Sequence, residues 1–586
     1  MPAPGHPAPA APASGHPAPA APPAYPNPAA SPGQQGPAST PGQQGPAGAP
    51  PPYPNPAAPP AHARAWPTNP PVVPAGGPPP AAQPPAQPPP AEDPPVGRRR
   101  RRTLIVALAA VLVLGLAAAG VVVVRPGPVD GWLGGDRAAT QAGPDLAEPP
   151  PPPVLTAAGN SAPAPTPDGV RAALAPLLSS SVLGDDVNIS VVDAVSDQPL
   201  FERGQDKPLV PASTTKLVTA VTVLAARGPA HRIATRVVAG ENPGEVVVIG
   251  AGDPTLAVDE TGWYPGAGRL DRLATQVKKA LGGTAPTKVT VDGSLFPGPN
   301  VGPGWDSDAH TGGFGAVITA LMVDGARLDP KDQGRGQARS QNPDLAAGRA
   351  FAGKLGLPGS AVSRGSAPAG SATAPVAATS ASPSATAAPG TELGRVESPP
   401  MIRLVEFMLR ESDNVVGEAL ARQVALARGK PGSFDGAGEA MDAVVAELGL
   451  PEAQTALSDG SGLSRRNRIT PGLLTELLSR AADGSRPELA GVFPGLPVAA
   501  WSGTLEDRFG PSGGASPGTA TGSGAGVVRA KTGTLSGVHA ISGVVTTAEG
   551  RLLAFAVLAN GVPGGPDQAQ PALDRIADAL AACGCR

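Results

Sequence analysis

The chain has 586 residues, a formal net charge of −3 at pH 7, 79 prolines and 77 glycines. Proline and glycine make up about a quarter of the sequence, which is typical of low-complexity segments and leaves only part of the chain to fold. The small net charge excludes a general electrostatic attraction to nucleic acid. Only two cysteines are present, Cys583 and Cys585, which excludes a disulfide framework or a cysteine-based zinc site. Their spacing is compatible with a small local disulfide or with two thiols.

Residues 1–97 are proline-rich and repetitive. GHPAPAAP occurs at 5–12 and 15–22, and YPNPAA occurs at 25–30 and 53–58. Such a segment has few apolar side chains to bury, so we expect a disordered tail that is partly polyproline II. A solvated spacer is favoured over recruitment of a partner, and the sequence identifies no cytoplasmic partner for the tail.

A candidate membrane anchor follows at residues 98–125. Five arginines, Arg98 to Arg102, precede an uncharged apolar run of 21 residues at 104–124. This length suits a helix crossing a bilayer core of about 30 Å, and the arginines place the N-terminal tail in the cytoplasm. We therefore expect a single-pass cell-membrane protein whose later residues lie outside, on the cell-wall side. A cleaved signal peptide and a basic nucleic-acid patch are the less favoured alternatives, because the run lies far from the N-terminus and the arginines abut apolar residues.

Residues 126–167 are again proline-rich and predict a semi-rigid stalk. From about 168 the composition becomes that of a folded domain. The segment 187–195 alternates like a strand, and an apolar stripe predicts a helix that starts near Ser213 and ends at Gly228. Further elements are short strands within 230–399, a disordered low-complexity loop at 364–392, a helical segment after 400, three antiparallel strands within 524–562 and a helix after 566. This order of elements predicts an α+β fold.

Ser213 is the first candidate catalytic residue. A serine hydroxyl is a poor nucleophile unless a base removes its proton, and no histidine of this chain has a motif context that would identify it as that base. Lys216 follows Ser213 by three positions in PASTTKLVTA, so the two side chains are neighbours on a helix. Burial and a nearby cation would lower the pKa of the amine and let it act as the base. Alone, the S-x-x-K pattern is weak.

Two further motifs strengthen this interpretation. Ser412, Asp413 and Asn414 form S-D-N in a helical segment, and Lys531 begins K-T-G-T on a strand. Each could be a simple cap or turn, but S-x-x-K, S-D-N and K-T-G in this order form the signature of class A β-lactamases and penicillin-binding proteins.

On these motifs the sequence resembles the active-site serine penicillin-binding proteins, above all the D-alanyl-D-alanine carboxypeptidase/endopeptidase family with a large insertion (class C low-molecular-mass type). Ser412 follows Ser213 by 199 positions, which leaves room for the insertion, and SDGSGLSRRNRITP at 458–471 resembles a stretch of that family. The resemblance implies a transpeptidase-like fold with an antiparallel sheet flanked by helices. It also implies a catalytic domain made of 168–229 and 400–586, with a mainly-β region inserted at 230–399.

The resemblance also implies roles for the motif residues. Ser213 would attack the D-Ala-D-Ala carbonyl, Lys216 would act as base, Ser412 would relay a proton, and Lys531 would supply positive potential and keep Lys216 neutral by repulsion. The expected substrate contacts come from Asn414, Thr532, Gly533, Thr534 and, at lower rank, Asp459. The backbone N–H groups of Ser213 and Thr534 would form the oxyanion hole.

The expected partners are peptidoglycan stem peptides as substrate, with β-lactams as covalent inhibitors. No metal or cofactor is expected. Asp306 and Asp308 could hold an ammonium of the stem, although a solvated loop is favoured for them. Two alternatives remain open: a serine β-lactamase of the same fold, and a non-catalytic cell-wall tethering protein.

Overall fold

The computed structural model describes residues 162–332, 336–371, 387–509 and 522–586, all within the compact unit Gly134–Arg586. The predicted tail, the candidate membrane anchor at 98–125 and the stalk up to residue 161 lie outside the described residues. So does most of the predicted low-complexity loop. Within the described residues, no helix combines the length and apolar character that a membrane span requires.

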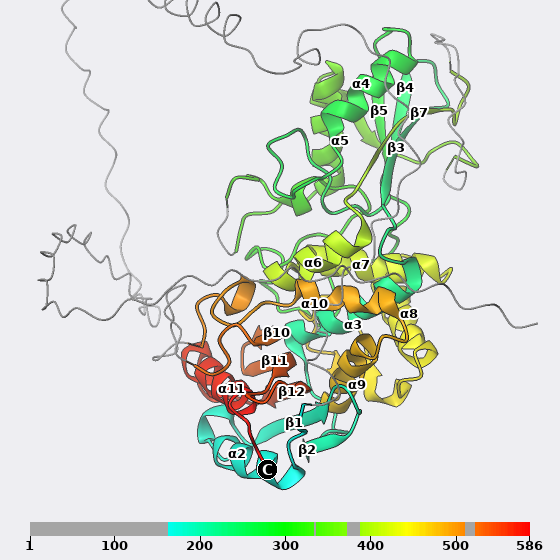
Figure 1. Cartoon of the computed structure of the whole chain (residues 1–586). Helices are drawn as coiled ribbons and strands as arrows, with labels where there is room; N and C mark the ends of the chain where they lie inside the picture. Colours follow the sequence, from blue (N-terminus) through cyan, green and yellow to red (C-terminus); the bar gives the residue numbers. More distant parts are fainter. Residues whose placement is uncertain (1–161, 333–335, 372–386, 510–521) are drawn as a thin grey trace, which may run out of the picture. The chain divides into compact units, whose positions relative to one another are not determined.

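A five-stranded antiparallel sheet forms the first part of the fold (Figure 1), in the order β10-β11-β12-β1-β2. Its strands are β1 (Asp186–Asp193), β2 (Pro199–Arg203), β10 (Val528–Leu535), β11 (Val538–Thr546) and β12 (Leu552–Asn560). The three predicted C-terminal strands are therefore confirmed, including their antiparallel pairing.

Helices cover both faces of this sheet. α2 (Pro167–Leu178) and α11 (Pro566–Ala581) pack with Ile189 and Phe555 in one apolar core. α3 (Thr215–Arg227) and α9 (Pro471–Ala482) pack with Ala554 and Leu558 in another. The strand predicted at 187–195 is confirmed as β1, and because both faces of the sheet are covered, it is buried at every position except Asp186.

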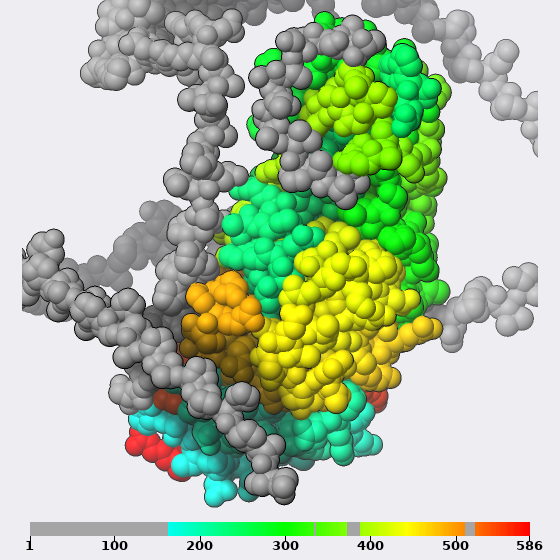
Figure 2. All heavy atoms as spheres, turned by 90° about the vertical axis from the view of Figure 1, so that its right-hand side faces the viewer, coloured from blue at the N-terminus to red at the C-terminus, as the bar shows by residue number. Residues whose placement is uncertain are grey.

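The second core extends into a layer of further helices. These are α6 (Met401–Glu411), α7 (Asn414–Ala427), α8 (Phe434–Glu447) and the short α10 (Val492–Gly495). In Figure 2, residues near the end of α3 (blue-green) lie beside those of α8 (yellow), although the two segments are far apart in sequence. The helical segment predicted after residue 400 is split at Ser412, which separates α6 from α7.

The inserted region contains a second five-stranded sheet in the order β6-β5-β4-β3-β7. Its elements are β3 (Ala234–Ala239), β4 (Glu245–Ile249), α4 (Leu270–Ala280), β5 (Lys288–Asp292), α5 (Pro343–Leu355), β6 (Val362–Arg364) and β7 (Glu392–Glu397). The sheet is mixed, because β4, β5 and β6 run parallel and the other pairs run antiparallel. The prediction of a mainly-β region is therefore wrong, since α4 and α5 pack on this sheet and supply much of its core.

The end of the chain lies against the beginning of α2. The N–H of Thr166 donates to the carbonyl of Cys585 at 2.8 Å, and Cys583 is joined to Cys585 by a disulfide. The structure thus selects the disulfide from the two alternatives that the sequence left open. A Cβ on Gly169 would lie 2.7 Å from the Cys585 backbone, so the close approach requires glycine at this position.

Candidate active site

Ser213 lies in a 3₁₀ turn (Ala212–Thr214) that leads directly into α3. The apolar stripe of α3 is buried, and this anchors the turn at the beginning of the helix. Lys216 occupies the first turn of α3, where its Nζ lies 3.1 Å from Ser213 Oγ. The contact predicted from the S-x-x-K spacing is present.

Lys216 is fully buried and its amine has two further partners. Nζ donates to Asn414 Oδ1 at 2.6 Å and to the carbonyl of Ser461 at 2.5 Å. Burial lowers the pKa of Lys216 from its usual 10.5 to about 8, while the charges of Asp459, Glu418 and Asp413 act in the opposite direction. Burial therefore brings the pKa of the amine toward physiological pH, and the repulsion from Lys531 stays a prediction.

The S-D-N motif forms the break between α6 and α7. Ser412 has a left-handed backbone (φ 56°), Asp413 caps α7, and Asn414 is the first residue of that helix. The cap consists of Asp413 Oδ1 accepting from the N–H groups of Val415 and Val416 at 2.9 and 3.1 Å. This geometry turns Asn414 toward Lys216 and places Ser412 at the edge of the same cleft.

The K-T-G motif lies on β10, the edge strand of the antiparallel sheet. Here the strand passes close to the turn that carries Ser213: a Cβ on Gly533 would lie 3.0 Å from Ser213 N and 2.8 Å from Pro211 O. Gly533 therefore permits close packing of the strand against this turn, and its contact with substrate stays a prediction. Lys531 is buried and donates to the carbonyl of Thr532 at 2.8 Å.

A cleft of about 1070 Å³ runs past these motifs. The sequence-predicted residues that line it are Ser213, Ser412, Asn414, Thr532 and Thr534. Four arginines line it as well: Arg327, Arg339, Arg410 and Arg508. Four acidic side chains line it too: Glu411, Asp413, Glu506 and Asp507. Arg327 and Arg508 are nearly buried and ion-paired, so the lining carries charges of both signs. Lys216 and Lys531 are buried beside the cleft rather than along its wall.

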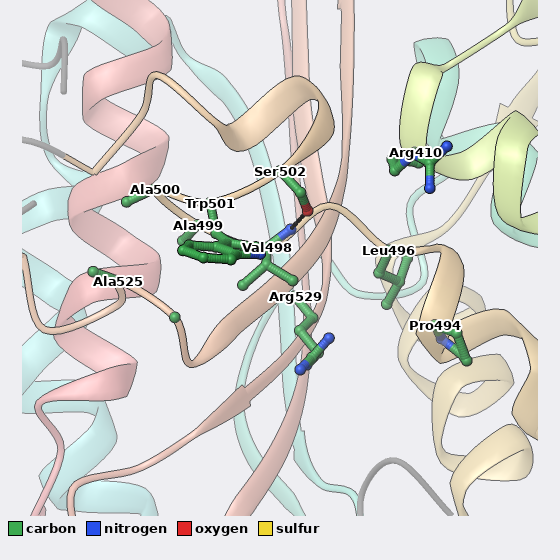
Figure 3. A pocket seen from close by; sticks show the side chains of 11 residues that line it. Arg410, Pro494, Leu496, Val498, Ala499, Ala500, Trp501, Ser502, Ala525 and Arg529 are labelled. Carbon is green, nitrogen blue, oxygen red and sulfur yellow. Dashed lines mark hydrogen bonds between the residues drawn. The ribbon is translucent and has the colours of Figure 1, made fainter. Parts of the chain in front are cut away.

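A second pocket, of about 590 Å³, lies next to the beginning of β10 (Figure 3). It shares Arg410, Trp501 and Ser502 with the cleft but contains no residue of the three motifs. Within it, the N–H of Val498 donates to Ser502 Oγ at 3.2 Å.

Asp459 faces its own loop instead of the cleft, contrary to the expectation that it binds substrate. Its carboxylate is fully buried and accepts from the N–H groups of Gly462 and Ser464 at 2.8 and 2.6 Å. Asn467 and Trp305 also donate to it, at 2.7 and 2.8 Å. The carboxylate thus organises the D-G-S-G-L-S-R loop, which supplies the Ser461 carbonyl to Lys216.

Sequence reasoning missed Glu418, which holds the same loop from α7. Its Oε1 accepts from the N–H groups of Gly460 and Ser461 at 3.2 and 2.9 Å, and its Oε2 pairs with the buried Arg422. Burial raises the pKa of Glu418 to about 7. One signal was available in the sequence, because Glu418 lies one helical turn after Asn414 in an otherwise apolar stretch.

Two predictions concern charged groups of the inserted region. Asp306 forms an ion pair with Arg465 at 2.8 Å, and this guanidinium lowers the pKa of the carboxyl. Asp306 is thus engaged within the protein, and Asp308 is exposed. In the described part of the chain, no cluster of histidine, cysteine, aspartate or glutamate side chains is arranged to hold a metal ion.

Known proteins match both the sequence and the fold. The sequence matches the D-Ala-D-Ala carboxypeptidase 3 (S13) family over residues 170–339 and 333–582. It is 39% identical over 463 residues to Carboxypeptidase Rv3627c of Mycobacterium tuberculosis, covering 77% of this chain and 92% of that protein. It is 37% identical over 429 residues to Carboxypeptidase DacB of Mycolicibacterium smegmatis, covering 72% and 86%.

The fold resembles that of penicillin binding protein 4 (dacB) from Haemophilus influenzae, with a TM-score of 0.53 at 20% identity, over 70% of this chain and 98% of that one. This likeness identifies the described part as a mixed α/β structure of the penicillin-binding-protein type. Since the family match extends over both the three motifs and the inserted region, the chain belongs to the D-Ala-D-Ala carboxypeptidase 3 (S13) family.

Proposed function

We propose that this protein is a serine-type D-Ala-D-Ala carboxypeptidase that acts on peptidoglycan stem peptides through an acyl-enzyme. One observation carries the proposal: the buried Lys216 amine lies 3.1 Å from Ser213 Oγ and is also bonded to Asn414 of the S-D-N motif. Membership of the S13 family and the names of the two mycobacterial relatives support the same activity.

In the acylation step, Ser213 Oγ attacks the carbonyl between the two D-alanines and its proton passes to Lys216 Nζ. A pKa of about 8 leaves a useful fraction of this amine neutral at pH 7 to 8. The backbone N–H groups of Ser213 and Thr534 stabilise the oxyanion that develops, and the close approach of β10 to the Ser213 turn supports this assignment. Thr532 and Thr534 receive the terminal carboxylate.

The leaving D-alanine takes a proton on its amine, with Ser412 as the relay from Lys216. Water then hydrolyses the ester on Ser213 and releases the shortened stem. The position of Ser412 along the cleft beside Asn414 supports its role as relay. A β-lactam presents a carboxylate and a reactive amide to the same groups, so it acylates Ser213.

We also propose that residues 104–124 anchor the protein in the cell membrane, with the proline-rich tail in the cytoplasm and the enzyme at the cell wall. The apolar run of 21 residues and the preceding arginines, Arg98 to Arg102, support this placement.

The test is mass spectrometry of the full-length chain after treatment with penicillin, together with D-alanine release from a peptide ending in D-Ala-D-Ala. We expect one adduct on Ser213 and none in Ser213→Ala, whereas Ser196→Ala, in an exposed turn, behaves like the parent protein. Rapid catalytic turnover of penicillin would instead identify a β-lactamase. Absence of both an adduct and D-alanine release would favour a tethering protein.

A further inference from the structure

The carboxylate of Asp413 connects the S-D-N turn with the inserted region. Its Oδ1 caps α7, and its Oδ2 accepts from the Tyr264 hydroxyl at 2.8 Å and from Arg327 Nη2 at 3.1 Å. The side chains of Arg327 and Asp413 are only 5% and 4% exposed. Each carboxylate oxygen therefore accepts hydrogen bonds from a different part of the protein: Oδ1 from α7, and Oδ2 from the inserted region.

The two residues on the inserted side are held firmly themselves. Arg327 also donates to the Tyr264 hydroxyl at 2.9 Å, to the Asp324 carbonyl at 3.0 Å and to the side chain of Gln337. Its guanidinium stacks 4.4 Å from the centre of the Trp263 ring. Arg327 is thus held by several partners, and through its bond to Asp413 it also holds that carboxylate in place.

Tyr264 makes a second contact with the same turn, through α6. Its ring packs edge-on against Phe407, with 4.9 Å between the ring centres. The inserted region reaches Asn414 as well, because Asn414 Nδ2 donates to the carbonyl of Phe314 at 2.9 Å.

The S-D-N turn needs such support. Ser412 has φ 56° and ψ 35°, a left-handed conformation that residues other than glycine adopt at an energetic cost. The turn also carries two groups that must be placed accurately, the Ser412 hydroxyl and the Asn414 amide. A displacement of about 1 Å at such groups can lower a rate about 100-fold.

We propose that Tyr264 and Arg327 are positioning residues, which hold the Asp413 carboxylate and thereby fix Ser412 and Asn414 for acylation. The proposal rests on the proposed function for the reaction it assists. It gives the inserted region a part in catalysis that acts through the S-D-N turn, although neither residue belongs to the three motifs.

The charges around Asp413 predict a pH signature. The titratable groups that face it are Arg327, Arg339, Lys216 and the neutral Tyr264 hydroxyl. Burial acts to raise the pKa of Asp413, but the charges of Arg327 and Arg339, together with the hydrogen bonds from Val416 and Tyr264, keep the carboxyl well below its usual range. Removal of Arg327 would therefore raise the pKa of Asp413, and the carboxylate would be lost at a higher pH than in the parent protein.

The test compares Arg327→Gln, Arg327→Lys and Tyr264→Phe in the full-length chain, with Arg364→Gln as the control. Arg364 is matched because it forms an ion pair with Asp344 inside the inserted region and does not contact the turn. We expect the penicillin acylation rate to fall about 100-fold in Arg327→Gln and about 3- to 10-fold in Tyr264→Phe. Arg327→Lys should recover part of the loss, and the control should be unchanged.

Two further readouts separate positioning from a general loss of structure. Below the limb that Lys216 sets, the acylation rate of Arg327→Gln should fall more steeply with decreasing pH than that of the parent protein, because Asp413 takes up its proton at a higher pH. Hydrogen exchange should accelerate in the peptide that contains Val415 and Val416. Unchanged acylation and unchanged exchange in Arg327→Gln and Tyr264→Phe would overturn the proposal. Because exchange is measured without substrate, it reports on the turn even if the parent protein is not acylated, an outcome that would contradict only the proposed function.

Discussion

The two five-stranded sheets of this protein differ in how they are covered and in how they serve the active site. The antiparallel sheet has helices on both faces, whereas the mixed sheet of the inserted region packs α4 and α5 into one core and has only a small apolar cluster around Val238, Val247 and Ile249 elsewhere. The first sheet contributes Lys531 and Thr532 directly, through its edge strand β10. The second contributes no strand residue to the cleft.

The inserted region instead reaches the site through segments outside its sheet, where Tyr264, Phe314 and Arg327 lie. The difference shows that regular elements can place a whole motif at once, because the spacing along a strand or helix is fixed. Irregular segments place single side chains, and each of these needs its own set of contacts. Substitutions in the two regions should therefore differ both in which property they change, acylation rate or stability, and in how large the change is.

The largest expected effect comes from the catalytic part. Lys216→Ala removes the proposed base, and we expect acylation by penicillin to fall by about 10²- to 10⁴-fold. Stopped-flow measurement of the acylation rate checks this. Lys207→Ala is the control, because Lys207 is an exposed lysine that lies shortly before the S-x-x-K motif in the sequence. Equal rates in the two variants would exclude Lys216 as the base.

The next prediction compares the cores of the two sheets. Phe555→Ala in β12 should lower the free energy of unfolding by about 3–5 kcal/mol, because the ring is fully buried and leaves a cavity. Val247→Ala, in the small cluster of the mixed sheet, removes two methyl groups and should cost about 1 kcal/mol. Chemical denaturation measures both values, and a larger loss for Val247→Ala would reverse the comparison.

A third variant examines the close packing around the nucleophile. Gly462 has φ 85°, and a Cβ at this position would lie 1.9 Å from the Ala212 carbonyl. Gly462→Ala should therefore destabilise the site by about 1–3 kcal/mol and slow acylation. Gly484→Ala is a matched control, since Gly484 has φ 75° but no atom near the added Cβ. If both variants acylate at the same rate, the packing contact has no role.

The smallest predicted change concerns pH. Lys216 acts as a base only when neutral, so the acylation rate should rise about tenfold per pH unit and level off above pH 8. The Glu418 charge raises the pKa of Lys216, so Glu418→Gln should move the midpoint to lower pH. A midpoint that moves upward, or that stays in place, would contradict the electrostatic account of this pair.

Much of the catalytic part could be predicted from sequence because its signals are local. The three motifs are each within four residues, and the apolar stripe of α3 fixes how Lys216 follows Ser213. The contacts of Asp413 could not be predicted, because Tyr264 and Arg327 precede it by 149 and 86 positions. The role of Asp459 could not be predicted either, because the sequence does not show whether its carboxylate faces its own loop or the cleft.

The inserted helices are a different case. Leu270, Leu273, Ala274 and Val277 follow a helical stripe in α4, so the signal was present although the surrounding β-rich segments obscured it. The backbone of Ser412 had no such signal, because a left-handed serine depends on the contacts of its neighbours.

The hydrogen bond between Thr166 and Cys585 has a consequence for protein engineering. Because Thr166 and Cys585 touch, a short linker can join the two ends of the described part of the chain. New termini can then be opened in the exposed loop around Gly429 and Lys430. In such a circular permutant the motifs would occur in the order K-T-G, S-x-x-K and S-D-N. A permutant that still reacts with penicillin would show that the arrangement in space, rather than the order in the chain, defines this enzyme.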